Sequence, residues 1–586
     1  MKTKSIFLTA ALGMMLGFSS CDLNYFPSDE LNSDALLQDV KGAEYIMNGC
    51  YALLKDEVEF LGYASGNCYV RHYFQLSEFP SDNICLCATS TDPLYEATAY
   101  MMNDGLKNVG TLWMVAYKVI FMANTVIETL DANNPDNNQL LGEAYFMRGL
   151  MHLHLVTLFA KPYSYGTDNL GIPLRTSTSS PVTKRDPVGQ VYEQIAKDLR
   201  KAADLMSKDG RVKDNHGYPC KDAALGVLSR VYLYMERYDD CIATVEEALN
   251  GEAPINKLEP SSTFATYFQR ARDSKETLFC VRHETTDNRA GSSIGSMYLK
   301  DGQGWGEIFP SDPLMFLYER YPSDIRLTGF IMPQYKVGST KICGYFVDPT
   351  SIPNAEGTVR HIPTAVLTDD GAGNYSFKEN GTTYNIEKRK INGDGKADPS
   401  GEYYEYHVNY GGTDCVVMVT PEMILNQKGT SYPNIYMNKF SYQDGDPMLS
   451  SPVLCRWAEV ILNRAEAYAH KGDMKALDDV NVIRKRAGIP DEGMFSATNM
   501  HGYVDANDPE IGTYTALEKI VLDERRMELA FEGHRMFDVY RNKLNMDRRY
   551  PGAQPWKVVP YTEPHIQYPI PNNEWTVSGI EQNPGY

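Results

Sequence analysis

One stretch of the sequence, from Lys221 to Leu249, restricts the possible folds of this chain more than any other. It contains LSRVYLYMERYDDCIATVEEAL, in which large residues come early and small residues fall where two helices would cross. The positions that define this spacing are Leu228, Tyr232, Tyr238, Cys241, Val245 and Ala248. Such spacing is typical of a tetratricopeptide helix–turn–helix pair. Because one pair can bury its apolar faces only by stacking on others, the sequence predicts several pairs in contact.

Other stretches also show the helical period. They are Leu112–Leu130, Leu140–Ala160, Val188–Met206, Val460–Gly488 and Ala516–Arg541. Val460–Gly488 is a weaker copy of the tetratricopeptide-like pair, and Ala516–Arg541 is expected to form one helix. The chain is therefore predicted to be mainly α, a tetratricopeptide-like superhelix of helix pairs formed by about residues 40–254 and 451–586.

Between about residues 255 and 450 the amino-acid composition changes. Gly, Pro, Asn and Tyr dominate, with short strand-like pieces such as Thr277–His283 and Asp414–Thr420. This pattern predicts a large loop-rich insertion that contains short strands. Loops held on a rigid scaffold commonly form binding surfaces, so the insertion is expected to face the ligand.

The amino terminus has the pattern of a targeting segment. A short basic region precedes the apolar run Ile6–Phe18, and two serines lead to Cys21. We predict a lipoprotein signal peptide over residues 1–20, with Cys21 acylated at the start of a body of residues 21–586. A plain secretory peptide is the alternative, because Phe18 stands where that pattern usually has Leu. No later run is expected to span a membrane, so the lipid would be the only membrane contact.

Charge and composition restrict the classes of ligand that this chain is expected to bind. Acidic residues outnumber basic ones by 76 to 56, which gives a net charge of −20 and argues against nucleic acid or anionic lipid. The chain has 40 Tyr against 21 Phe. A phenol combines a flat apolar face with a polar tip, which suits a wet binding surface.

The sequence contains no complete catalytic or metal-binding motif, so we predict no enzyme activity, cofactor or metal. Gly291–Gly295 fits the nucleophile-elbow pattern, but a Gly-rich loop follows it instead of a helix. His152 and His154 are two apart on a helix and point to different faces. Lys390–Glu402 resembles a calcium loop, with a Gly/Asp turn as the alternative. A pair of carboxylates for glycoside hydrolysis remains open, and so does disulfide pairing.

Four blocks carry a resemblance to a known family. They are Glu143–Pro173, Arg456–Gly488, Glu524–Asp538 and the closing segments Tyr568–Pro571 with Gln582–Tyr586. In this order they resemble the SusD/RagB family of outer-membrane lipoproteins. Weaker matches are Ser81-Asp82-Asn83, Trp113 with Ala123-Asn124, and Pro310-Ser311 to Leu317, whereas the middle of the chain matches poorly.

The resemblance implies a helical body with tetratricopeptide-like pairs, placed on the cell surface over a SusC-like TonB-dependent transporter in the outer membrane. It implies a non-catalytic lipoprotein that captures oligosaccharide and delivers it to that transporter. A peptide-binding import lipoprotein on the same scaffold is the alternative, and an exported glycoside hydrolase is the third.

Candidate ligand-binding residues come from aromatic loops, since a sugar ring packs its C–H face on an aromatic plane. Trp305 lies between glycines that give its indole little local cover. Tyr298 is nearby, and Lys300 and Gln303 can supply hydrogen bonds. The resemblance adds a second segment, with Tyr95, Tyr100 and Asn103. The alternative is that Trp305 only packs its own loop, whereas Trp113 and Trp457 lie in helices and are expected in the core.

The motif near the carboxyl end is expected to be structural. Glu524, Arg525, Glu528 and Glu532 are spaced to pair along one helix, and Leu529 and Phe531 are expected to anchor that helix.

Overall fold

The protein is represented by a computed structural model. It describes residues 40–60, 62–66, 68–86, 90, 92–179, 184–300, 302–331, 343–345, 365–393, 395–420, 423–425, 431–433, 435–550 and 558–586. The predicted signal peptide and Cys21 lie outside these ranges.

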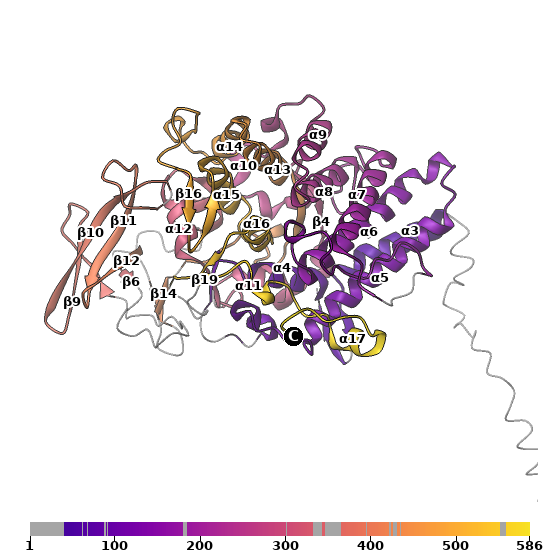
Figure 1. Ribbon diagram of the computed structural model, residues 1–586, viewed down its shortest axis with the longest axis horizontal. Helices are drawn as coiled ribbons and strands as arrows, with labels where there is room; N and C mark the ends of the chain where they lie inside the picture. The colour runs from indigo at the N-terminus through magenta and orange to yellow at the C-terminus, as the bar shows by residue number, and fades with distance from the viewer. Residues whose placement is uncertain are drawn as a thin grey trace, which may run out of the picture.

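The first half of the body is a stack of antiparallel helices, shown in purple in Figure 1. They are α3 (Val40–Leu53), α4 (Cys68–Glu78), α5 (Lys107–Thr129), α6 (Asn138–Phe159), α7 (Val188–Leu205), α8 (Lys221–Tyr234) and α9 (Tyr238–Leu249). From α5 to α9, each helix packs on the next. Small residues allow this packing: a Cβ on Gly142 of α6 would lie 2.4 Å from Met206 Cγ at the end of α7.

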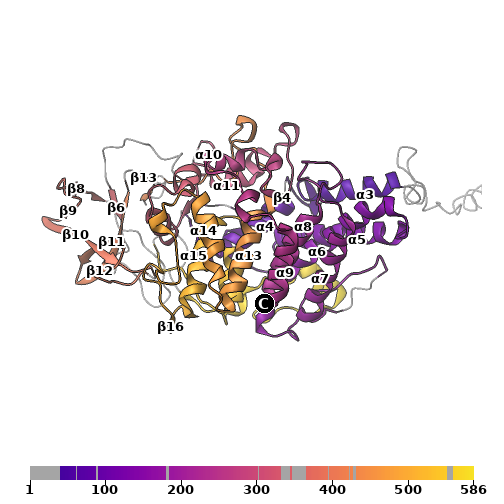
Figure 2. The same cartoon turned by 90° about the horizontal axis from the view of Figure 1, so that it is seen from above.

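The second group of helices continues the first. It comprises α13 (Trp457–His470), α14 (Lys475–Arg486), α15 (Ala516–Glu528) and α16 (Arg535–Arg541). Helix α13 packs against both α8 and α9, and Figure 2 shows the two groups side by side. Buried Arg230 of α8 donates to Glu459 of α13 at 2.5 and 2.7 Å. The predicted tetratricopeptide-like superhelix of helix pairs is confirmed.

The prediction of one helix over Ala516–Arg541 is wrong, because the chain breaks between α15 and α16. Phe531 and Gly533 have φ values of 66° and 78°, which end the helical path. The break brings this segment against α4: the Gly533 N–H donates to Glu78 Oε1 at 2.6 Å. A Cβ on Gly533 would lie 2.7 Å from Ser77 Oγ, so this approach requires glycine.

The carboxylates of this motif do not pair along one helix, which is a second correction. Glu528 accepts from Arg456 at 2.7 Å and from Arg326 at 3.3 Å, and it also pairs with Arg486. The remaining members of this buried ion cluster pair across elements in the same way: Glu276, Asp324, Lys439, Arg484, Glu524 and Glu532. The cluster therefore joins α14 and α15 to the start and end of the insertion.

Helix α5 is the one described helix that is long and apolar enough to cross a membrane, which the sequence reading did not anticipate. Of its most apolar window, 61% is buried inside the body, as in the core helix of a globular protein.

Two short strand pairs attach the insertion to the scaffold. Strand β4 (Thr277–Cys280) pairs with β15 (Val453–Arg456), and β3 (Ile84–Leu86) pairs with β5 (Ile308–Pro310). Near them lie the short helices α11 (Ile294–Tyr298) and α12 (Asp312–Glu319).

The insertion also contains a larger sheet than the sequence suggested. Seven antiparallel strands follow the order β7 (Ala365–Val366), β6 (Cys343–Tyr345), β12 (Thr413–Thr420), β11 (Tyr403–Tyr410), β10 (Thr382–Ile391), β9 (Tyr375–Glu379) and β8 (Thr368–Asp369). The sheet has its own small core, formed by Leu367, Phe377, Ile386, Val408, Cys415 and Val417. It projects from the end of the molecule opposite to α3 (Figure 1).

Candidate ligand-binding surface

The β3–β5 pair brings the two predicted ligand segments together. Leu86 at the end of β3 is paired with Ile308 at the start of β5. The loop that leaves β3 and the loop that enters β5 therefore meet at the same end of this pair. A side-chain hydrogen bond between Glu307 and Ser90 joins the two loops directly. Burial raises the pKa of Glu307, and this hydrogen bond opposes the shift.

Trp305 is fixed on this surface through hydrogen bonds to the loop beneath it. Its backbone N–H donates to the Ser296 carbonyl at 2.7 Å, and its indole Nε1–H donates to the Gly291 carbonyl at 3.0 Å. A Cβ on Gly304 would lie 2.4 Å from the Ser296 oxygen, so only glycine lets the loop approach α11 this closely. The Trp305 side chain is half-buried and packs on the edge of the main core. Its indole is thus held in one orientation while part of it faces solvent.

Tyr298 and Tyr100 are not surface rings, which corrects their assignment as ligand contacts. Tyr298 is 1% exposed and packs edge-on against Phe531, with 5.3 Å between ring centroids. Tyr100 is 6% exposed, and its hydroxyl lies 2.5 Å from the Tyr540 hydroxyl and donates to the Pro80 carbonyl at 2.7 Å. Burial raises the pKa of both phenols, that of Tyr100 to about 12. Both rings belong to the core.

The other predicted residues lie at the surface. Lys300 and Asn103 are exposed, and Tyr95 and Gln303 are half-buried. Gln303 Oε1 accepts from the Tyr442 hydroxyl at 3.2 Å, so a third loop borders this surface. The sequence patterns did not indicate Glu307, which stands two residues after Trp305, or Tyr442, which only the tertiary structure brings to Gln303. The residue after Asn103, Asp104, accepts from the Trp575 indole of α17 (Asn572–Ser578) at 2.9 Å. Below, "the Trp305 surface" means Trp305, Lys300 and Gln303.

The segments that resemble a nucleophile elbow and a calcium loop form a helix cap and a turn. Ser293 of the Gly291–Gly295 segment caps α11 by accepting from the Ser296 N–H at 3.0 Å. In the Lys390–Glu402 loop, Asn392 Oδ1 accepts from the Lys396 N–H at 2.9 Å, as expected for a turn. Asp394 of that loop lies outside the described residues.

Across the described ranges, no group of three or more His, Cys, Asp or Glu side chains is placed to hold a metal ion. The free cysteines there are Cys50, Cys68, Cys85, Cys220, Cys241, Cys280, Cys415 and Cys455.

Comparisons with known proteins give matches to two family models and to a related protein. Residues 275–586 match the family model described as "SusD family", and residues 66–233 match one described as "Starch-binding associating with outer membrane". The chain is 23% identical to SusD-like protein P2 of Formosa agariphila over 503 residues, which cover 84% of this chain and 83% of that protein.

Solved structures show the same fold. A SusD superfamily protein from Bacteroides thetaiotaomicron aligns with a TM-score of 0.64 and 21% identity, covering 92% of this chain and 99% of that one. Surface glycan-binding protein A from Bacteroides fluxus aligns with a TM-score of 0.57 and 17% identity, covering 94% of this chain and 100% of that one.

Proposed function

This chain belongs to the SusD family, and we propose that it is a non-catalytic glycan-binding lipoprotein that captures oligosaccharide at the cell surface and delivers it to a SusC-like TonB-dependent transporter in the outer membrane. The family match and the glycan-binding protein among the structural neighbours support carbohydrate as the class of ligand. The observation that carries the proposal is the pairing of β3 with β5, which sets two aromatic loops together on a rigid helical body.

On this surface we assign the indole of Trp305 as the platform for a sugar ring. Its hydrogen bond to Gly291 fixes the ring before the ligand arrives, which lowers the entropy cost of binding. Lys300 and Gln303 lie in the same loop as Trp305 and offer hydrogen-bond donors to hydroxyl groups, and Tyr95 and Asn103 are proposed as further contacts from the segment after β3.

The proposed location depends on acylation of Cys21, which would tether the acidic body to the outer membrane. Replacement Cys21→Ala should release the protein into soluble fractions. Unchanged membrane association of that variant would contradict the lipid anchor.

The binding assignment is tested with the mature, unlipidated protein on a glycan array, followed by titration of the best hit. A centrally placed aromatic residue contributes about 2 kcal/mol or more. Trp305→Ala should therefore weaken binding roughly thirtyfold. Trp305→Phe should weaken it less, because a flat ring remains. Tyr45→Ala, which removes a 55% exposed ring on α3, is the control and should leave binding unchanged.

Other outcomes would favour other functions. Equal affinity of Trp305→Ala and the parent protein would refute the Trp305 assignment. An array without hits, together with measurable peptide binding, would favour the peptide-binding alternative. Turnover of a bound polysaccharide would establish a glycoside hydrolase.

A further inference from the structure

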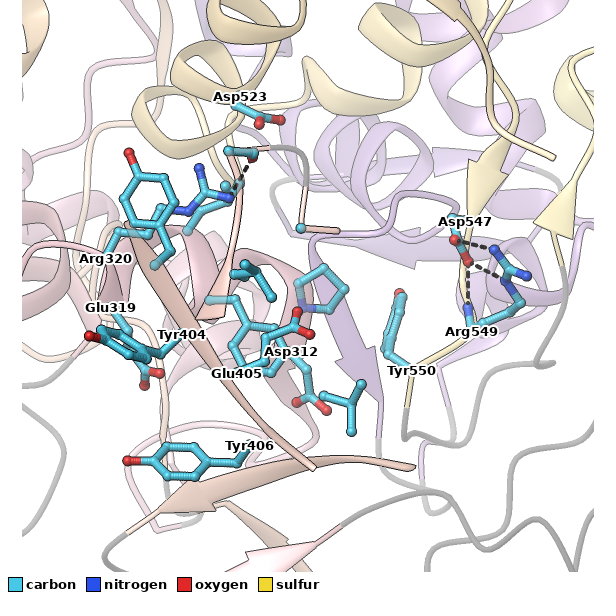
Figure 3. Close-up of a pocket in the computed structure, with 18 of the residues that line it drawn as sticks. Asp312, Glu319, Arg320, Tyr404, Glu405, Tyr406, Asp523, Asp547, Arg549 and Tyr550 are labelled. Carbon is cyan, nitrogen blue, oxygen red and sulfur yellow. Dashed lines mark hydrogen bonds and ion pairs between the residues drawn. The ribbon is translucent and has the colours of Figure 1, made fainter. Parts of the chain in front are cut away.

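A deep cleft lies between the seven-stranded sheet and the helical body, away from the Trp305 surface. Its cavity has a volume of about 830 Å³ and is lined by α12, by strands β10 to β12 and by residues from α15 and its following loops. This volume is within the range of roughly 300–1,000 Å³ that is usual for small-molecule sites. None of the residues of the Trp305 surface lines it. Figure 3 shows side chains from the sheet and from the body converging on the cavity.

The sheet supplies aromatic rings to the cleft. Tyr404 and Tyr406 are two apart on β11, so they point to the same side of the strand. Tyr404 is 49% exposed, which is unusual for a ring of this size beside a protein body. The Lys388 ammonium lies 4.3 Å from the Tyr404 ring centroid and 5.9 Å from that of Tyr406. These rings offer flat apolar surfaces, and the nearby cation disfavours a positively charged ligand above them.

Most of the cations that face the cleft have partners. Arg320 donates to the Tyr503 hydroxyl at 2.6 Å and to the Gly393 carbonyl at 2.8 Å. Arg549 pairs with Asp547 at 2.8 Å. Lys519 is paired with Asp523, and Arg526 is bound to Asn83 and to the Asp82 carbonyl. Lys388 differs: it is exposed, and among the described residues it makes no ion pair, so its ammonium is open to a ligand.

One carboxylate that lines the cleft has no partner among the described residues. Glu319 at the end of α12 lines the cavity, and among the described residues it has no hydrogen bond or ion pair. The Glu319 side chain is exposed at the cavity. Glu405 also lines the cavity, but it pairs with His407 at 3.2 Å and, between Tyr404 and Tyr406 on β11, points to the other side of the strand. Glu319 is thus the carboxylate that remains open as an acceptor for hydroxyl donors.

From this combination of cavity, rings and an unpaired acceptor, we propose that the cleft is a second oligosaccharide site. Tyr404 and Tyr406 would hold the ring faces, Glu319 would accept hydrogen bonds from hydroxyl groups, and Lys388 would donate them. The inference rests on the proposed function only for the ligand class, a glycan.

The test uses isothermal titration of the mature protein with maltohexaose, cellohexaose, xylohexaose and mannohexaose. The variants are Tyr404→Ala and Glu319→Gln in the cleft, and Trp305→Ala on the other surface. Glu387→Gln, at an exposed position of β10 outside the cavity, is the matched control. Tyr404 is half-exposed and Glu319 unpaired, so both variants should keep the parent circular dichroism spectrum.

We expect at least one neutral probe to bind at two sites. Tyr404→Ala and Glu319→Gln should each weaken one site roughly tenfold and leave the site that Trp305→Ala removes.

The possible failures are distinguishable. If Trp305→Ala abolishes all binding and the cleft variants change nothing, the cleft proposal is wrong and the proposed function stands. If only the cleft variants matter, the Trp305 assignment fails and the cleft site stands. If no probe binds the parent protein, both proposals fall.

Discussion

Replacement Glu528→Gln should destabilise this protein far more than the same substitution at the surface. The Glu528 carboxylate is 1% exposed and lies among three guanidinium groups, those of Arg326, Arg456 and Arg486. Glutamine keeps the shape of the side chain but removes its charge. The three cations would then share a buried pocket with one negative charge too few.

The magnitude follows from burial. Removing one partner of a buried ion pair lowers the free energy of unfolding by about 3–5 kcal/mol, because the remaining charge stays desolvated. Glu247→Gln is the matched control: Glu247 is 38% exposed and pairs with Arg200 and Lys221. Exposed pairs contribute under about 1 kcal/mol, so the control should cost little.

The pH dependence of stability tests the same argument independently. Burial alone would raise the pKa of Glu528, but the charges of Arg486, Arg456 and Arg326 outweigh it and hold the pKa well below the usual range. Its stabilising contribution is therefore present above the unfolded pKa, near 4.5, and is lost as the pH falls. Glu528→Gln should remove this part of the acid sensitivity.

The assay is urea denaturation followed by far-UV circular dichroism at neutral pH and in an acid series. Glu528→Gln should unfold at a clearly lower urea concentration than the parent protein, and Glu247→Gln near the parent value. Equal midpoints for the two variants would refute the reasoning. Arg486→Gln combined with Glu528→Gln should cost less than the sum of the single changes, because the two charges interact.

Two further predictions concern a histidine and a glycine. Burial lowers the pKa of His470, but hydrogen bonds to Glu466 and Glu518 outweigh burial and raise the pKa from 6.5 to about 9. The resulting stabilisation, about 3 kcal/mol at most, is complete below pH 6.5 and disappears by about pH 9; His470→Gln should flatten that part of the stability profile, and an unchanged profile would contradict it. A Cβ on Gly295 would lie 2.1 Å from the Phe440 carbonyl oxygen, so Gly295→Ala should displace α11, lower the melting temperature and weaken glycan binding. Gly291→Ala, whose Cβ would meet nothing within 4 Å, is its control, and equal behaviour of the two alanine variants would refute the argument.

The helix pairs were predictable because their pattern is local. In Lys221–Leu249 the apolar residues repeat with the helical period, and the structure forms α8 and α9 there. Trp113 and Trp457, expected in the core from their helical positions, are 2% and 3% exposed. The break after α15 was not predictable in the same way. It depends on contacts with Glu78 and Ser77, which are far away in the sequence.

The binding residues were harder to predict, because burial of a loop aromatic is decided by distant residues. Tyr298 and Trp305 lie in one loop-rich segment, yet Tyr298 turns inward to Phe440 and Phe531 while Trp305 stays at the surface. Tyr100 is buried through a contact with Tyr540. No local pattern in the sequence distinguishes these cases.

The two kinds of carboxylate in this chain show why the acid count alone said little about function. Glu528 and Glu319 lie on neighbouring elements, α15 and α12. Cations surround Glu528 and lower its pKa, so its charge stabilises the scaffold. Glu319 is exposed and has no such partner among the described residues, which leaves an acceptor at an open cavity. A scaffold can tolerate buried charge only where it is paired, whereas a ligand site needs groups that the protein leaves unpaired. The pairing of each acid is therefore what separates structural from binding residues, and pairing is a property of the fold.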